Sequence, residues 1–163
     1  MSRAATIAAA VLAALTLAAP AFARPDFPRP LTFSLPADGV VTGPFGEWRG
    51  GHSHAGIDFG LLRSLTVHAA ASGVVRSAGY LAGYEGYGLT VIVQLDNAPY
   101  QTLYAHLSST RVEPGDYVDA GDVIGRAGCS GSCSGTHLHF ELRRAGVAID
   151  PTPFLRDALR SSA

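Results

Sequence analysis

The chain has no lysine among its 163 residues, and its twelve basic residues are arginines scattered along the sequence. The thirteen acidic residues leave a formal charge of only −1. A nearly neutral protein has no electrostatic reason to bind nucleic acid or to coat an anionic surface. We therefore expect no nucleic-acid partner, and any other partner must be recognised by a shaped site.

Long apolar runs are also scarce, and the one that exists, Ala4–Ala19, lies at the N-terminus. It follows the short positive start Met1-Ser-Arg3 and precedes the small-x-small sequence Ala21-Phe-Ala23, a pattern typical of a cleaved secretory leader. The run is short for a membrane span, which needs about 20 residues. No cysteine follows it, which argues against a lipoprotein. We predict a signal peptide over residues 1–23, no membrane span after its cleavage, and export to the periplasm or the extracellular space.

The remainder is long enough for one hydrophobic core, and its pattern predicts strands and turns. Four prolines in residues 24–36 indicate an extended lead-in, and residues 37–160 read as one domain. Nineteen glycines and a single plausible helix, from Pro151 to about Leu159, favour an all-β fold. Strands are expected over 39–43, 67–77, 88–95, 100–107, 117–118 and 123–124.

The segment 134–142, SGTHLHFEL, places two histidines one residue apart in an apolar run. Side chains alternate between the faces of a strand, so His137 and His139 should share one face. Glu141 falls on the same face, where it could orient a ligand or simply end the strand in solvent. The same rule pairs Tyr104 with His106, and makes Tyr104 a candidate oxyanion donor, although a strand tyrosine is more often a packing residue.

The glycine-rich segment 50–60 supplies His54 and Asp58, which we place on a loop or at the entry to a strand. Imidazole and carboxylate are both good zinc ligands, and a catalytic zinc typically has three protein ligands and one open position. His54, Asp58 and His139 make such a set, with His106 and His137 free to handle protons. Any one histidine alone is more often structural, and we assign His52 to the edge of the site or the surface.

Four segments occur in the order found in lysostaphin-like zinc metallopeptidases, and the chain resembles that family from about Pro36 to Leu155. The segments are His54-Ala-Gly-Ile-Asp58, Leu103-Tyr-Ala-His106-Leu-Ser108, 112–121 and Gly135-Thr-His137-Leu-His139-Phe-Glu141. The resemblance implies that His54, Asp58 and His139 bind one zinc ion per chain. It also implies that His106 and His137 are the catalytic histidines.

By the same resemblance the fold is all-β, a mostly antiparallel β-sheet or sandwich of the duplicated hybrid motif type. An active-site groove walled by loops and a short C-terminal helix are expected with it. The implied activity is hydrolysis of peptide bonds in bacterial peptidoglycan, with an unidentified regulatory or targeting protein as a further possible partner. The alternatives are a catalytically silent wall-binding or regulatory module of the same fold and, more remotely, a carrier domain. A lipoyl or biotinyl carrier is excluded because the chain has no lysine to carry the group. A phosphohistidine carrier would be cytoplasmic, so the predicted leader argues against it.

The chain departs from the family in the loop before the histidine pair. Cys129 and Cys133 stand where small hydroxyl residues are usual, and Thr136 stands where proline is common. In an oxidising compartment these cysteines should form a disulfide that closes a very small ring. The alternative, two thiolates on a metal, would require a second site.

Overall fold

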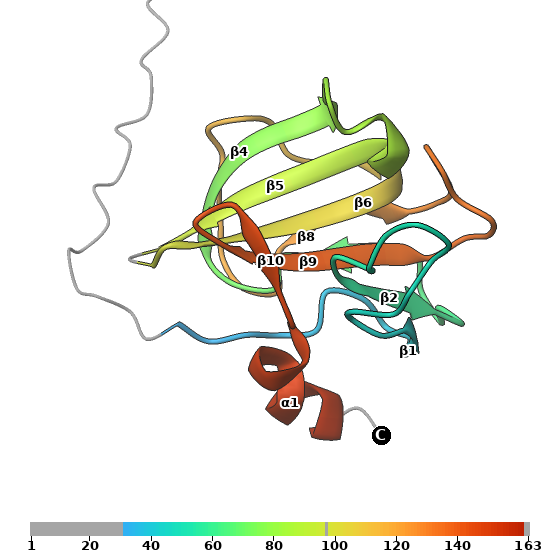
Figure 1. Cartoon of the computed structure of the whole chain (residues 1–163). Coiled ribbons are helices and arrows are strands. Elements are labelled where there is room, and N and C mark those ends of the chain that lie inside the picture. The colour runs from blue at the N-terminus through green and yellow to red at the C-terminus, as the bar shows by residue number, and fades with distance from the viewer. Residues whose placement is uncertain (1–30, 97, 162–163) are drawn as a thin grey trace, which may run out of the picture.

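The computed structural model describes residues 31–96 and 98–161 (Figure 1). The predicted signal peptide, residues 1–23, lies outside this part of the chain, as does the lead-in up to Pro30. No helix within the described ranges has the length and apolar character needed to span a bilayer.

The described residues form ten strands and one α-helix, with a short 3-10 helix between β4 and β5. The strands are β1 (Val40–Gly43), β2 (Ile57–Gly60), β3 (Thr66–His68), β4 (Gly73–Tyr80), β5 (Leu89–Leu95), β6 (Tyr100–Thr110), β7 (Tyr117–Val118), β8 (Val123–Ala127), β9 (Leu138–Arg144) and β10 (Val147–Ile149). The helices are η1 (Glu85–Tyr87) and α1 (Thr152–Ser161).

Every strand pair in the sheet is antiparallel, and the main path runs β1-β2-β9-β6-β5-β4-β7. Three strands branch from it: β10 pairs with β9, and β8 pairs with both β6 and β3. The sheet is open, so β1 and β7 lie at its ends. The predicted mostly antiparallel all-β fold with a short C-terminal helix is confirmed.

Strand β9 follows the predicted alternation. Leu138, Phe140 and Leu142 are fully buried in the main hydrophobic core. His139 and Glu141 lie between them in sequence and project from the other face of the strand, where they contact each other. Since β9 is paired on both sides, with β2 and β6, its register is fixed and the alternation has no freedom to slip.

Strand β6 does not follow the predicted alternation. Between its pairings with β5, Tyr104 opposite Val91 and Leu107 opposite Leu89, β6 contains one residue more than its partner, which is a β-bulge. His106 adopts a left-handed backbone conformation there, with φ of 59°. Tyr104 and Leu107 both enter the main core, so the expectation that Tyr104 and His106 share a face is wrong.

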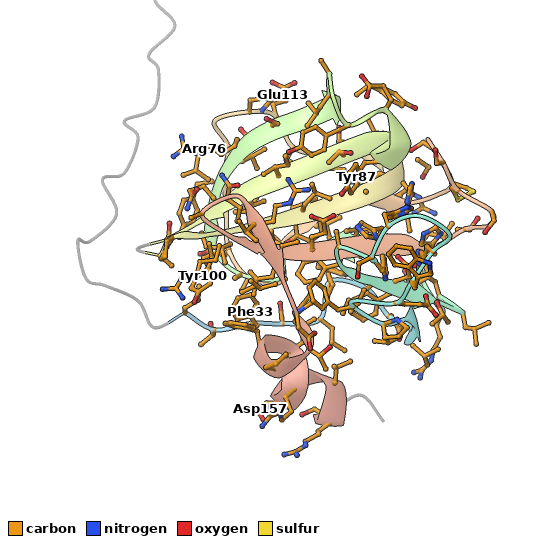
Figure 2. The ribbon with its side chains drawn as sticks, in the orientation of Figure 1. Phe33, Arg76, Tyr87, Tyr100, Glu113 and Asp157 are labelled. Atoms are coloured by element: carbon orange, nitrogen blue, oxygen red, sulfur yellow. A yellow bond between two sulfur atoms is a disulfide. The ribbon has the colours of Figure 1, made fainter. Side chains whose placement is uncertain are left out.

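The helix and the lead-in cover one edge of the domain. The α1 helix begins at Thr152, one residue after the predicted start. The Asp150 carboxylate caps it by accepting a hydrogen bond from the Thr152 N–H at 2.9 Å. Phe33 meets the ring of Phe154 edge-on at 5.5 Å, and Figure 2 shows it beside the helix. Residues 31–36 have no regular secondary structure but are tied down, since Ser34 donates its N–H to the Ala70 carbonyl.

Candidate functional site

The site lies where β2 meets β9. In that antiparallel pair Asp58 stands directly opposite His139, so the two side chains project from neighbouring strands onto the same face. His54 comes from the loop that enters β2. That loop and the loop before β9 lie at the same end of the sheet, toward the right of Figure 1.

Three ligand atoms converge there. His54 Nε2 lies 2.9 Å from His139 Nδ1, His139 Nδ1 lies 2.9 Å from Asp58 Oδ1, and His54 Nε2 lies 3.2 Å from the same oxygen. All three residues are buried. Among the described residues, they form the one group of three His, Cys, Asp or Glu side chains placed to share a metal ion.

The outer nitrogens of the two rings fix where their protons lie. His54 Nδ1 is 2.8 Å from the Pro44 carbonyl, and His139 Nε2 is 3.0 Å from a carboxylate oxygen of Glu141. Both oxygens only accept, so each ring carries a proton on the outer nitrogen and, in its neutral form, turns a bare lone pair inward. Metal-binding histidines typically donate their other ring N–H to a carboxylate or a backbone carbonyl in this way.

The donor set therefore fits a cation. Two imidazole lone pairs and one carboxylate oxygen within 3.2 Å of one another repel unless a positive charge lies among them. A tetrahedral metal with ligand distances near 2.0 Å separates its ligand atoms by about 3.3 Å, a few tenths more than these spacings. The group can hold a metal after a small outward adjustment.

The second carboxylate oxygen of Asp58 is held by Arg49, whose Nη2 donates to Oδ2 at 2.7 Å. Burial opposes ionisation of this carboxyl, but the close polar contacts with His139, His54 and Arg49 outweigh burial and hold its pKa well below the usual range. Asp58 is therefore charged at any physiological pH. The Arg49 contact fixes which oxygen faces the two histidines.

Behind His139 lies a buried polar network centred on Glu141, which is fully shielded from solvent. Its Oε1 accepts from His139 and, at 2.7 Å, from the Tyr87 hydroxyl, and its Oε2 accepts from Arg143 Nε at 2.5 Å. Burial raises the pKa of Glu141, but the hydrogen bonds from His139, Arg143 and Tyr87 lower it by more. Burial and the neighbouring carboxylate raise the pKa of Tyr87 to about 12, so Tyr87 remains a donor. Arg143 also reaches the Tyr84 hydroxyl at 2.7 Å.

His106 and His137 stand side by side next to the triad, with ring centroids 4.7 Å apart. His106 Nδ1 is 2.8 Å from the Ser130 carbonyl and His137 Nδ1 is 2.7 Å from the Gly135 carbonyl, so both rings carry the proton on Nδ1 and keep Nε2 bare. His137 Nε2 lies 3.7 Å from Asp58 Oδ1. Burial, reinforced by the neighbouring histidines, holds the pKa of His106 below its ordinary value, which leaves this ring neutral near pH 7.

Two adjoining hollows open over these groups. One, of about 530 Å³, is lined by Arg49, His52, His54, Tyr87, His106, His139 and smaller residues. The other, of about 390 Å³, lies on the side of Asp58 and His137 and shares Arg49, His106 and Ser132 with the first. An extended chain laid across both would pass directly over the triad. His52 does lie at the edge of the site, and Figure 2 shows Tyr87 near the ends of β5 and β6.

The structure brings His54, Asp58, His106, His137, His139 and Glu141 together and leaves Tyr104 out. The Tyr104 side chain is fully buried in the core, where its hydroxyl accepts a hydrogen bond from the Ala70 N–H at 2.7 Å. It is a packing residue and not an oxyanion donor. His68, on β3, contacts the Gly121 carbonyl away from this group.

Sequence reasoning did not identify Arg49, Tyr87, Arg143 or Ser130. Arg143 had a usable signal, because it continues the His139–Glu141 alternation by two residues along β9. The other three come from loops or from η1, where no periodicity predicts which way a side chain points.

The Cys129 and Cys133 sulfur atoms lie at disulfide-bonding distance, with the Cα atoms 5.3 Å apart. Neither contributes to a metal-binding group among the residues described. The alternative of a second, thiolate-bound metal is therefore not supported.

Comparison with known proteins gives a consistent result. Residues 52–151 match the family model of peptidase family M23. Lysostaphin from Staphylococcus simulans is 35% identical over 124 residues, which are 74% of this chain and 25% of that protein. The DD-carboxypeptidase/endopeptidase Mpg from Neisseria meningitidis is 36% identical over 119 residues, 68% of this chain and 26% of that protein. The chain thus spans about a quarter of the length of these relatives.

Among solved structures, a zinc-containing peptidase from Vibrio cholerae superposes with a TM-score of 0.65 at 26% identity, over 73% of this chain and 39% of that one. The matched family segment contains His54, Asp58, His106, His137 and His139.

Proposed function

The chain belongs to peptidase family M23, and from that premise we propose that it is an exported zinc metalloendopeptidase that hydrolyses peptide bonds in bacterial peptidoglycan. His54, Asp58 and His139 would hold one zinc ion per chain, and His106 and His137 would act on the substrate. The names of two relatives support a peptidoglycan substrate, and the Vibrio cholerae structure supports zinc as the metal.

One observation carries the proposal: the inward lone pairs of two histidines and one carboxylate converge beside two further histidines, each of which turns Nδ1 toward a backbone carbonyl and leaves Nε2 facing the site. A purely structural metal site is closed by a fourth protein ligand. Here the fourth direction is the side on which the two hollows open and His106 and His137 stand.

Zinc, when bound, supplies Lewis acidity, which polarises a carbonyl group and brings the pKa of water down to about 7. The residues supply the proton transfers. His106, neutral and bare at Nε2, is suited to take up a proton as general base. His137 Nε2, when protonated, can stabilise negative charge on the substrate oxygen or protonate the leaving amine. The Ser130 and Gly135 carbonyls keep both rings in the required tautomer.

The metal assignment is tested by composition. Purified protein should contain about one zinc per chain by mass spectrometry of the metal. His139→Ala removes one inward lone pair and should lose the metal. His106→Ala leaves the three ligand atoms intact and should keep the metal while losing most activity. A zinc-free preparation with full activity would overturn the mechanism.

The substrate assignment is tested by digestion. The protein is incubated with intact peptidoglycan and with defined muropeptides that carry either direct stem cross-links or glycine-containing bridges. The masses of the released fragments are then measured by mass spectrometry. New amine and carboxyl ends at one bond type identify the cleaved bond. If the zinc-loaded chain releases nothing but still binds the polymer, it is the catalytically silent module instead.

Export is tested separately, by sequencing the N-terminus of the protein recovered from outside the cytoplasm. The proposal predicts a mature chain that begins near Arg24, after the Ala21-Phe-Ala23 sequence.

A further inference from the structure

The five-residue ring closed by Cys129 and Cys133 adjoins both histidines that stand beside the triad. Its second residue, Ser130, presents its carbonyl to His106 Nδ1 at 2.8 Å. Its last residue, Cys133, places its sulfur 3.7 Å from His137 Nδ1. Gly128, immediately before the ring, accepts the backbone N–H of His137 at 3.1 Å.

Ser130 is also fixed through its side chain. Its hydroxyl donates to the Leu107 carbonyl at 2.8 Å and accepts the N–H of Leu89 at 2.9 Å. Leu107 directly follows His106, so a single residue holds both the ring of His106 and the backbone next to it. Because His106 lies in a β-bulge with left-handed backbone, the regular ladder of β6 does not fix its orientation, and the Ser130 carbonyl does.

The ring closed by Cys129 and Cys133 packs against the loop that leads into β5. Ser132 donates its N–H to the Gly86 carbonyl at 2.8 Å. Gly131 and Gly88 both have left-handed backbone and face each other so closely that a Cβ on Gly131 would lie 2.5 Å from the Gly88 nitrogen. This contact needs a tightly turned ring, since neither side has room for a side chain.

We propose that the Cys129–Cys133 ring is a positioning element that holds His106 through the Ser130 carbonyl and supports His137 through the Cys133 sulfur. The disulfide keeps the turn closed. Opening the ring releases the Ser130 carbonyl. The His106 ring then loses its fixed tautomer and its orientation toward the substrate, whereas the three metal ligands stay in place. The catalytic consequence rests on the proposed function.

The test uses the full chain with Cys129→Ser and Cys133→Ser combined, and Ser130→Ala as a second variant that keeps both cysteines. Ser64→Ala is the matched control, because Ser64 is exposed and its hydroxyl is hydrogen-bonded to Thr66, away from the ring. We expect kcat to fall about tenfold in the double variant and several-fold in Ser130→Ala. Zinc content should stay at one per chain, and KM should change less than kcat.

A second readout does not depend on turnover. Two-bond proton–nitrogen NMR correlations of the zinc-loaded protein should show His106 as a single Nδ1-protonated tautomer in the wild type and as a tautomer mixture in the double variant. If the double variant does not fold, Ser130→Ala with the cysteines intact takes its place in both measurements.

Unchanged kcat and a fixed His106 tautomer after ring opening would overturn the inference. So would a raised KM with unchanged kcat, the result expected if the ring merely walls the hollow. If the wild type hydrolyses no peptidoglycan, the proposed function fails, whereas the NMR comparison still decides whether the ring positions His106.

Discussion

Replacing Glu141 with glutamine should reduce both metal affinity and stability, although the two side chains have nearly the same shape. The carboxylate is fully buried and receives only donors: His139 and Tyr87 on one oxygen and Arg143 on the other. An amide cannot satisfy both sides. Turned one way, its NH₂ group faces the Arg143 guanidinium; turned the other way, it faces His139 Nε2 and Tyr87.

The two orientations have different costs. Both leave Arg143 without a carboxylate, and breaking a buried ion pair costs about 3–5 kcal/mol; the first also turns the NH₂ group toward the guanidinium, so that two donors face each other. We expect the lower end, because Arg143 keeps its hydrogen bond to Tyr84 and is not completely buried. The second orientation favours the proton on His139 Nδ1, the atom that would bind the metal. Loss of such a supporting partner lowers metal affinity about 10–100-fold.

Both effects can be measured on one preparation. Urea unfolding of the metal-free chain gives the free-energy difference, and competition with a chromophoric chelator gives the zinc affinity. Glu113→Gln, at an exposed position labelled in Figure 2, is the matched control and should change neither quantity. If Glu141→Gln equals this control in stability and zinc affinity, the network around His139 does not support the metal site and the reasoning is refuted.

Three further outcomes follow from the same contacts. Tyr87→Phe removes one donor to the Glu141 carboxylate and should cost about 1.5 kcal/mol in urea unfolding, whereas Tyr80→Phe, at a residue 75% exposed, should cost nothing measurable. Folding lowers the pKa of Glu141, so the ionised carboxylate stabilises the folded chain above about pH 4.3, and this stabilisation is lost as the pH falls further. Urea unfolding of the metal-free protein should therefore show a larger loss of stability between pH 5.5 and pH 3 for the wild type than for Glu141→Gln. His106→Gly should be about 1 kcal/mol more stable than His106→Ala, because the left-handed backbone at this position disfavours any residue with a Cβ, and an equal or lower stability would show that the bulge relaxes.

The sequence was most informative where regular strands determine the direction of side chains. On β9 the period of two predicts both the buried face and the face that carries His139 and Glu141, because partners on both sides hold the register. The all-β character and the C-terminal helix also followed from turn residues and from Asp150-Pro151, whereas the antiparallel pairing was implied by the family resemblance.

Prediction failed where the chain leaves regular geometry. At His106 the extra residue of the bulge reverses the alternation, and no glycine marks the left-handed backbone at this position. Arg49 and Ser130 contact Asp58 and His106 from loops, and such contacts depend on how loops distant in sequence pack together. The chemistry of the site was thus readable from strands, but its fine orientation was not.

The triad joins parts of the chain that are far apart: His139 is 85 residues from His54 and 81 from Asp58. A cation shared by all three would act as a cross-link between the first strands of the domain and one of the last. Closing a loop of that length removes about 4.5 kcal/mol of chain entropy from the unfolded state, by the relation used for disulfides. The ion would thus stabilise the folded domain as well as take part in catalysis, and loss of the metal would lower the stability of the whole domain together with the order of the site.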